Sequence, residues 1–132
     1  MSYLSSSRRK PNRNVVRWIE ETEETMLFLS VLTLGEIRSG IERLNPGRRR
    51  GRLESWLAVD LRLRFQDRIL TISDAIAEAW GALSAAGAKK GRPLPVIDGL
   101  LAATALHHNL MLVTRNDTDV KGTGVPTLNP WK

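Results

Sequence analysis

Acidic residues at three separate places in the sequence could together bind a metal ion. Glu36 follows the apolar run at residues 26–31, and Asp98 opens an Ala-rich apolar segment. A third group follows the apolar run at residues 110–113 and comprises Asn116, Asp117 and Asp119. Carboxylate oxygens are the ligands that Mg²⁺ and similar hard cations prefer. If these places meet at one edge of a sheet, their charges repel one another unless a cation neutralises them.

Each acidic place also has a purely structural explanation. Glu36 completes a capping box with Thr33, three residues earlier, at the start of a helix. Asp98 suits the N-cap of the helix that follows it, where the helix dipole favours its charge. The polar residues after position 113 are common turn formers. Each acid taken alone is better explained in this way, whereas several acids at the carboxyl edge of one parallel sheet favour a metal site, and both interpretations stay open.

The apolar patterning predicts the elements that would position these acids. Uninterrupted apolar runs of strand length alternate with segments in which apolar residues recur at helical spacing. The expected strands lie at residues 26–31, 69–72, 110–113 and 125–128, and the expected helices at 33–44, 53–61, 73–87 (with Ser73 as N-cap) and 98–108. This alternation predicts an α/β fold with a central, mainly parallel sheet flanked by helices. A length of 132 residues without an internal repeat predicts one domain covering residues 1–132.

The N-terminal part differs from the rest of the chain. Residues 1–13 are polar and basic, a poor start for a compact domain, and a short amphipathic helix is expected at residues 15–19. An α/β domain of this kind normally opens with a buried strand, and the pattern shows none before Val15. The tryptophans at helical core spacing are expected to pack inside the domain; they are Trp18, Trp56 and Trp80.

The chain is basic, with a formal net charge of +6 and a pI of about 10.5. Such a balance favours an anionic partner, either nucleic acid or an acidic protein. The candidates for contact with a nucleic-acid backbone are Arg48, Arg49, Arg50, Lys89, Lys90, Arg92 and Arg115. The alternative is that these residues are solvated surface charges.

Residue content disfavours several classes of site and location. The sequence has no cysteine, which excludes disulfides and thiolate metal sites and suits a reducing cytoplasm. His107 and His108 are adjacent and have no further His or Cys at ligand spacing, so a zinc site is not expected. No apolar run is long enough to span a bilayer, and the polar N-terminus is not a signal peptide. We therefore expect a cytoplasmic protein without a membrane partner.

Four segments resemble PIN-domain ribonucleases of the VapC and FitB toxin type. They are SVLTLGEIRSGIERL (residues 30–44), AEAWGAL (77–83), PVIDGLLAATALHHNLMLVTRND (95–117) and VPTLNPW (125–131). The resemblance runs from about Val15 to Trp131, and the motifs recur in the family's order. It implies the toxin of a toxin–antitoxin pair, a metal-dependent endoribonuclease that uses Mg²⁺ or Mn²⁺ to hydrolyse RNA phosphodiester bonds. It also implies a cognate antitoxin protein and a second copy of the chain as partners.

The resemblance assigns roles to particular residues. Glu36 matches the acid of the LTLGEI helix start, and Asp98 matches the acid that opens the DxLLAATA helix. The third acid of the family falls within the cluster after the LVTRN strand, where Asp119 is preferred and Asn116 is a weaker candidate ligand. The basic residues named above would then contact the RNA backbone.

One departure from the family concerns the N-terminus. The family begins with a strand that ends in Asp-Thr-Asn, and SSSRRKPNRNVVRWI (residues 5–19) resembles what comes just after that motif. Met1 is therefore expected to fall just past the aspartate, so that the first strand and its metal ligand are missing. Residues 1–7 contain no acid that could substitute. The alternative function is thus a truncated, catalytically impaired toxin that still binds its antitoxin and dimerises.

Overall fold

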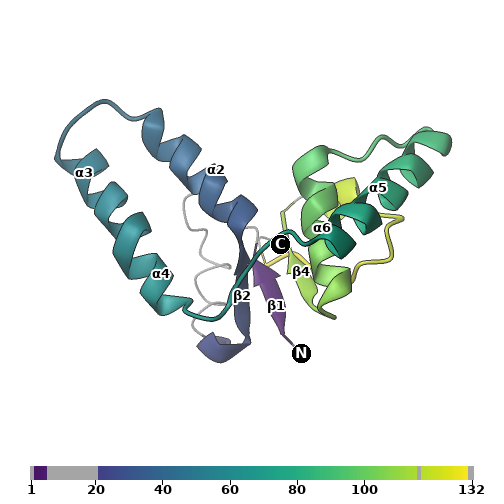
Figure 1. Ribbon diagram of the computed structural model, residues 1–132, viewed down its shortest axis with the longest axis horizontal. Helices are drawn as coiled ribbons and strands as arrows, with labels where there is room; N and C mark the ends of the chain where they lie inside the picture. The colour runs from purple at the N-terminus through teal and green to yellow at the C-terminus, as the bar shows by residue number, and fades with distance from the viewer. Residues whose placement is uncertain (1, 6–20, 116, 131–132) are drawn as a thin grey trace.

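A five-stranded parallel sheet forms the centre of the protein (Figure 1), whose computed structural model describes residues 2–5, 21–115 and 117–130. The strands are β1 (Tyr3–Ser5), β2 (Leu27–Ser30), β3 (Ile69–Leu70), β4 (Met111–Val113) and β5 (Thr127–Leu128). Their order across the sheet is β3-β2-β1-β4-β5, and all four pairings are parallel. The predicted α/β fold with a parallel sheet is confirmed.

The expectation that the first strand is missing is wrong. β1 lies in the middle of the sheet, where Leu4 pairs with Phe28 of β2 and with Leu112 of β4. Leu4 is fully buried. A three-residue central strand takes its hydrogen bonds from both neighbours and needs only one core side chain, so no apolar run reveals it in the sequence. Residues 6–13 and the helix expected at residues 15–19 lie outside the described residues.

Two groups of helices cover the two faces of the sheet and form two arms (Figure 1). The first arm holds α2 (Val31–Glu42), α3 (Arg48–Ser55), the π-helical segment η2 (Trp56–Asp60) and α4 (Leu61–Arg64); the second holds α5 (Asp74–Lys89) and α6 (Val96–His107). Short 3-10 turns are η1 (Glu24–Met26) and η3 (Asp117–Val120). Alternation along β2 explains the two layers, because Leu27 and Leu29 join the core under the first arm while Phe28 packs against the core under the second.

The starts of the helices differ from the predicted caps at two places. Ser30 is the N-cap of α2, since its Oγ accepts from the Leu32 amide at 3.0 Å, so the predicted capping box of Thr33 and Glu36 is wrong. Asp98 is not an N-cap either, because α6 begins directly after Pro95 and Asp98 lies in its first turn. The predicted cap at Ser73 is confirmed, as its Oγ accepts from the Ile76 amide at 3.2 Å.

The tryptophans also depart in part from the expected core packing. Trp56 opens the π-helical segment and is 37% exposed, while the adjacent Leu57 is buried instead. A π-helical turn changes the helical phase, so spacing counted at 3.6 residues per turn assigns Trp56 to the wrong face. Trp80 is half-buried, in line with the expectation, whereas Trp18 lies outside the described residues. Among the described helices, none has the length and hydropathy needed to cross a membrane.

Candidate active site

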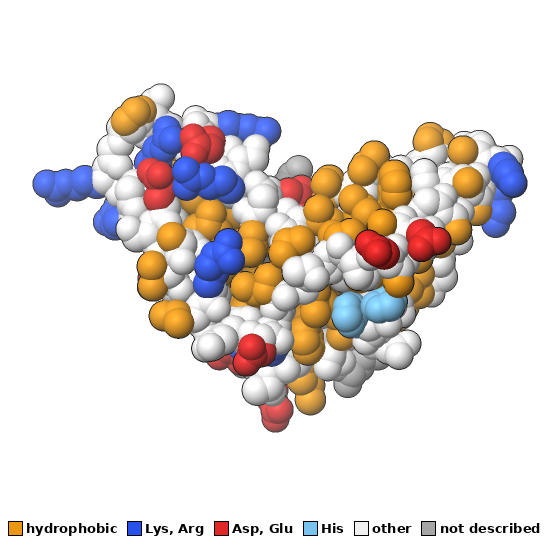
Figure 2. All heavy atoms as spheres, in the orientation of Figure 1, with side chains coloured by type: hydrophobic (Ala, Val, Ile, Leu, Met, Phe, Trp, Pro, Cys, Tyr) orange, Lys and Arg blue, Asp and Glu red, His pale blue; other side chains and the backbone are white. Residues whose placement is uncertain are grey.

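The carboxyl ends of the strands meet at the edge of the sheet that faces the space between the two arms (Figure 1). From β1 the chain proceeds first to β2 and β3 on one side and later to β4 and β5 on the other. Such a change of direction leaves a crevice beside the central strand, where open α/β sheets place their ligands. Figure 2 shows this region as a hollow with hydrophobic side chains on the wall of the second arm and acidic atoms where the arms meet. Functional side chains are therefore expected at this edge.

Glu36 belongs to the first arm and lies in the second turn of α2. The start of that helix is tied to β1, because the buried Thr33 donates from its Oγ1 to the Ser5 carbonyl at 3.4 Å. Glu36 is half-buried and its Oε1 is shielded from solvent. A carboxylate oxygen kept out of bulk water attracts a cation more strongly than an exposed one does.

Asp98 belongs to the second arm and lies in the first turn of α6, where it is half-buried. Because α6 leads into the parallel strand β4, its first turn lies at the carboxyl edge of the sheet. The dipole of the helix favours a negative charge there. The next residue, Gly99, allows the close approach of α5, since a Cβ at this position would lie 3.0 Å from Trp80 Cδ1 and 2.8 Å from Leu94 Cδ2. Asp98 therefore stands on a tightly packed helix.

The third acidic place follows β4. Asp119 lies in η3, is exposed, and borders a cavity of about 470 Å³ at the end of α5. Asp117 is half-buried in the same turn, and Asn116 lies outside the described residues. Within residues 2–5, 21–115 and 117–130, no three His, Asp or Glu side chains form a group that could hold a metal ion. The shared ligand set of Glu36, Asp98 and Asp119 stays a prediction.

The kinds of donor atom at this edge fit a hard dication better than zinc. Glu36 and Asp98 offer carboxylate oxygens, as Mg²⁺ and Mn²⁺ prefer. The imidazoles lie at the opposite end of α6, where the rings of His107 and His108 stand edge-on at 4.9 Å. Burial and the neighbouring His107 lower the pKa of His108. The donor set thus fits an oxygen-coordinated metal ion in type.

Ser5 lies at this edge of the sheet, and the sequence pattern did not single it out. It ends the central strand β1, and the resemblance to the family leads us to expect an aspartate at the end of the first strand. The available sign was the run Ser5–Ser7 directly after Tyr3 and Leu4, which has the length of the expected Asp-Thr-Asn. The strand is therefore present, and the residue at its end carries a hydroxyl group in place of the expected carboxylate.

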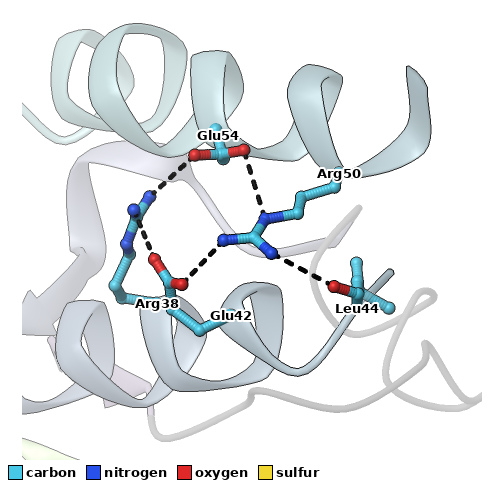
Figure 3. Close-up of polar contacts among 5 residues, drawn as sticks. All are labelled: Arg38, Glu42, Leu44, Arg50 and Glu54. Atoms are coloured by element: carbon cyan, nitrogen blue, oxygen red, sulfur yellow. Dashed lines mark hydrogen bonds and ion pairs between the residues drawn. The ribbon is translucent and has the colours of Figure 1, made fainter. Parts of the chain in front are cut away.

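The basic residues of α3 differ in whether they form ion pairs. Arg50 joins a network between α2 and α3 (Figure 3), in which it contacts Glu42 at 2.7 Å and Glu54 at 3.4 Å. Arg38 contacts the same two glutamates at 2.5 Å and 3.5 Å. Arg50 also donates to the Leu44 carbonyl at 3.2 Å. These charges neutralise one another, so Arg50 serves the packing of the first arm.

The other basic candidates lie at the surface. Arg48 and Arg49 begin α3 and are exposed. Lys89 ends α5, while Lys90 and Arg92 follow it and border the same cavity as Asp119. Arg115 is exposed just after β4. The candidates thus lie at three places: on α3 in the first arm, at the end of α5 in the second arm, and just after β4.

Comparison with known proteins gives matches along nearly the whole chain. The profile of the PIN domain matches residues 1–125. The chain is 30% identical over 125 residues to the plasmid stability protein StbB of Pseudomonas syringae pv. tomato, which covers 95% of this chain and 90% of that protein. It is 29% identical over 124 residues to the toxin FitB of Neisseria gonorrhoeae, and this match covers 94% of this chain and 89% of FitB.

Solved structures agree with this assignment. The crystal structure of FitAcB from Neisseria gonorrhoeae superposes with a TM-score of 0.90 at 28% identity and covers 99% of both chains. The structure of FitAB bound to an IR36 DNA fragment superposes with a TM-score of 0.91 at 26% identity, over 100% of this chain and 96% of that one. With the parallel sheet and its order in place, these matches show that the chain belongs to the PIN-domain family, in its VapC and FitB toxin branch.

Proposed function

We propose that this protein is a metal-dependent endoribonuclease and the toxin of a toxin–antitoxin pair. The observation that carries the proposal is the position of Glu36 and Asp98, on opposite arms, at the carboxyl edge of a PIN-domain sheet. A relative of similar length, 28% identical over 123 residues, is the VapC ribonuclease Y4jK of Sinorhizobium fredii. The proposed substrate is RNA, and the reaction is hydrolysis of a phosphodiester bond.

The side chains of this chain have separate roles in such a reaction. Glu36 and Asp98 supply charged oxygens for a Mg²⁺ or Mn²⁺ ion, with Asp119 as a third ligand and Asn116 as a weaker neutral one. When bound, the ion lowers the pKa of a water molecule and stabilises the charge that develops on the phosphate. The helices hold the two half-buried carboxylates before substrate arrives, which lowers the cost of ordering them.

The proposed partners follow from the family. A cognate antitoxin would bind the toxin, and a second copy of the chain would complete a homodimer. The toxin would act on RNA in the cytoplasm. Arg48, Arg49 and Arg115 are exposed and remain proposed contacts to the RNA backbone.

A second candidate function has one observation in its favour. Ser5 places a neutral hydroxyl at the end of the central strand, so the site has one carboxylate fewer than the family pattern. Hard dications depend on charged oxygen ligands, so metal affinity should be weak. The chain would then be an impaired toxin that captures its antitoxin without cleaving RNA. It is not a truncated toxin in the sense of a missing first strand, because β1 is present.

The test of the nuclease compares two aspartates that both stand in the first turn of a helix. A fluorescent RNA is incubated with the protein and Mn²⁺, and the rate of cleavage is measured. Asp98→Asn should lower that rate at least about a hundredfold, because one lost ligand charge removes several kcal/mol of attraction to a dication. Asp74→Asn in the exposed first turn of α5 removes the same charge and should cleave like the parent. Equal cleavage by a folded Asp98→Asn protein would refute the proposed role of Asp98.

The two candidate functions are separated by a substitution at the end of β1. Ser5→Asp should raise the affinity for Mn²⁺ about tenfold or more, measured by calorimetry, because it adds a charged oxygen at the proposed site. Ser55→Asp on the exposed surface of α3 adds the same charge elsewhere and should leave the affinity unchanged. Cleavage that appears only in Ser5→Asp identifies the natural chain as the impaired toxin. Unchanged Mn²⁺ affinity in a folded Ser5→Asp protein would mean that β1 does not end at the metal site.

A further inference from the structure

We propose that the cavity at the end of α5 is a binding groove for the phosphate backbone of RNA, an inference that rests on the proposed nuclease function and extends it. The cavity has a volume of about 470 Å³ and lies between the end of α5 and the turn that follows η3. Its polar lining consists of Lys90, Arg92, Thr118, Asp119, Lys121 and Thr123. We call it the basic groove. Lys121 is about thirty positions from Lys90 in the sequence, so only the fold brings these charges together.

One wall of the basic groove is a rigid helix end. The Lys90 amide donates to the Ala86 carbonyl at 3.3 Å, and the Arg92 amide donates to the Gly87 carbonyl at 2.8 Å. Gly91 takes the left-handed conformation, φ +71°, that this reversal requires. The backbone folds back so closely that a Cβ on Gly87 would lie 2.6 Å from the Arg92 carbonyl oxygen. The backbone that carries Lys90 and Arg92 is thus fixed beside the groove before any ligand binds.

The opposite wall is a tight turn anchored in the core. Val120 is 2% exposed and belongs to the core under the second arm. The Thr123 hydroxyl donates to the Val120 carbonyl at 2.7 Å, and its oxygen accepts from the Val125 amide at 3.3 Å. The Lys121 amide donates to the Thr118 carbonyl at 3.3 Å. Lys121 therefore rises from a fixed backbone, which lowers the entropy lost on binding.

The charges of the basic groove have no ion-pair partner within the described part of the chain. Lys90, Arg92 and Lys121 form no salt bridge there, in contrast to Arg50, which has two. Asp119 is the single carboxylate among three cations in the lining. Figure 2 shows basic side chains gathered at the far end of the second arm. A fixed excess of positive charge in a hollow attracts an anion, and the guanidinium fork of Arg92 matches a phosphate.

The position of Asp119 connects the groove with the proposed active site. Asp119 is the family-matched third acid and also borders the basic groove. A strand bound by Lys90, Arg92 and Lys121 would therefore run toward the carboxyl edge of the sheet, where Asp98 begins α6. A repeating phosphate backbone suits this arrangement because one phosphate can occupy the groove while another lies at the acids.

The test compares two double variants that each lose two positive charges. Lys90→Ala/Lys121→Ala alters the groove, whereas Arg43→Ala/Arg62→Ala alters two exposed arginines of the first arm that form no described ion pair. The probe is a fluorescent twelve-nucleotide single-stranded RNA of mixed sequence, bound in EDTA so that no cleavage occurs, with anisotropy measured at several salt concentrations. The groove variant should bind roughly tenfold more weakly, and its salt slope should fall by about 1.4 because two phosphate contacts are lost. The control should bind within about twofold of the parent.

Several outcomes would overturn the proposal that the groove binds RNA. Equal weakening in both double variants would mean that only net charge matters. A groove variant that binds RNA like the parent but loses its antitoxin would assign the cavity to a protein partner. Thermal melting checks that both variants fold. If Lys90→Ala/Lys121→Ala does not fold, the single charge reversal Lys121→Glu, at an exposed turn position, replaces it in the binding experiment.

Failure of the groove and failure of the nuclease can be told apart. If the parent protein binds RNA through the groove but cleaves no RNA with Mn²⁺, the result supports the groove and refutes the proposed nuclease activity. If the parent cleaves RNA and the groove variant binds RNA as tightly as the parent does, the result supports the nuclease activity and refutes the role of the groove.

Discussion

The two arms of the molecule use charge in opposite ways. On the first arm, Arg38 and Arg50 are neutralised by Glu42 and Glu54, which join α2 to α3 (Figure 3). On the second arm, the cations after α5 have no such partners among the described residues. The two basic runs look alike in the sequence. Their difference shows that a run of basic residues indicates a binding surface only where the fold supplies no compensating acids.

The arms also differ in how their helices pack. α6 buries a continuous surface of small and apolar residues, with Leu101 at 1% and Ala102, Ala103 and Ala105 at 0% exposed. In the first arm, α3 continues through the π-helical segment η2 into α4. Val59 of η2 is 52% exposed, and Leu63 of α4 is 66% exposed. The middle of α6 is therefore a rigid support for a site, because dense packing leaves its side chains few alternative positions. The exposed apolar residues of α6, Val96 at 56% and Leu106 at 36%, lie near its two ends.

The largest stability difference is expected between leucines of the two arms. Leu101→Ala should lower the free energy of unfolding by about 3 kcal/mol, since it leaves a cavity in the core. Leu63→Ala, on the exposed face of α4, should change it by less than about 0.5 kcal/mol. Urea denaturation measures both. Similar losses in the two variants would mean that Leu63 is buried in solution, for example in a dimer.

Glycines give the next contrast. Gly99→Ala should destabilise the protein by about 1–3 kcal/mol, because the new methyl group overlaps Leu94 and Trp80. Gly40→Ala in α2 meets nothing within 4 Å and should stabilise it by about 0.5–1 kcal/mol, since alanine favours the helix. Thermal melting gives the signs directly. A stabilising Gly99→Ala would contradict the close packing of Gly99 against Leu94 and Trp80.

The smallest effect concerns the ion-pair network. Arg50→Ala should cost about 0.5–1 kcal/mol, as the network lies near the surface and is screened by water. Arg49→Ala, next to it and exposed, should cost nothing measurable. Urea denaturation at low and high salt separates the two, because only the loss at Arg50 should shrink when salt screens the charges. A salt-independent loss would assign Arg50 a packing role alone.

Much of the fold could be predicted from the pattern of residues, but its centre could not. Four of the five strands coincide with apolar runs of strand length, as at residues 69–72 for β3. β1 could not be predicted from the sequence, because a central strand of three residues is specified by hydrogen bonds to its neighbours rather than by its own hydrophobicity. The caps at Thr33 and Asp98 were misplaced because other positions, Ser30 and Pro95, take the helix starts. Local motifs allow several such positions, and packing selects one.

The sequence by itself determined the class of fold, the acidic residues that could serve a metal ion, and the basic character that favours an anionic partner. These properties depend on residue type and spacing along the chain, which the sequence contains in full. Only the tertiary structure decided that Ser5 ends the central strand, that Arg50 is neutralised within the first arm, and that Lys121 joins Lys90 and Arg92 in one groove. Each of these depends on contacts between residues far apart in the chain, and such contacts are set by the packing of whole helices and strands.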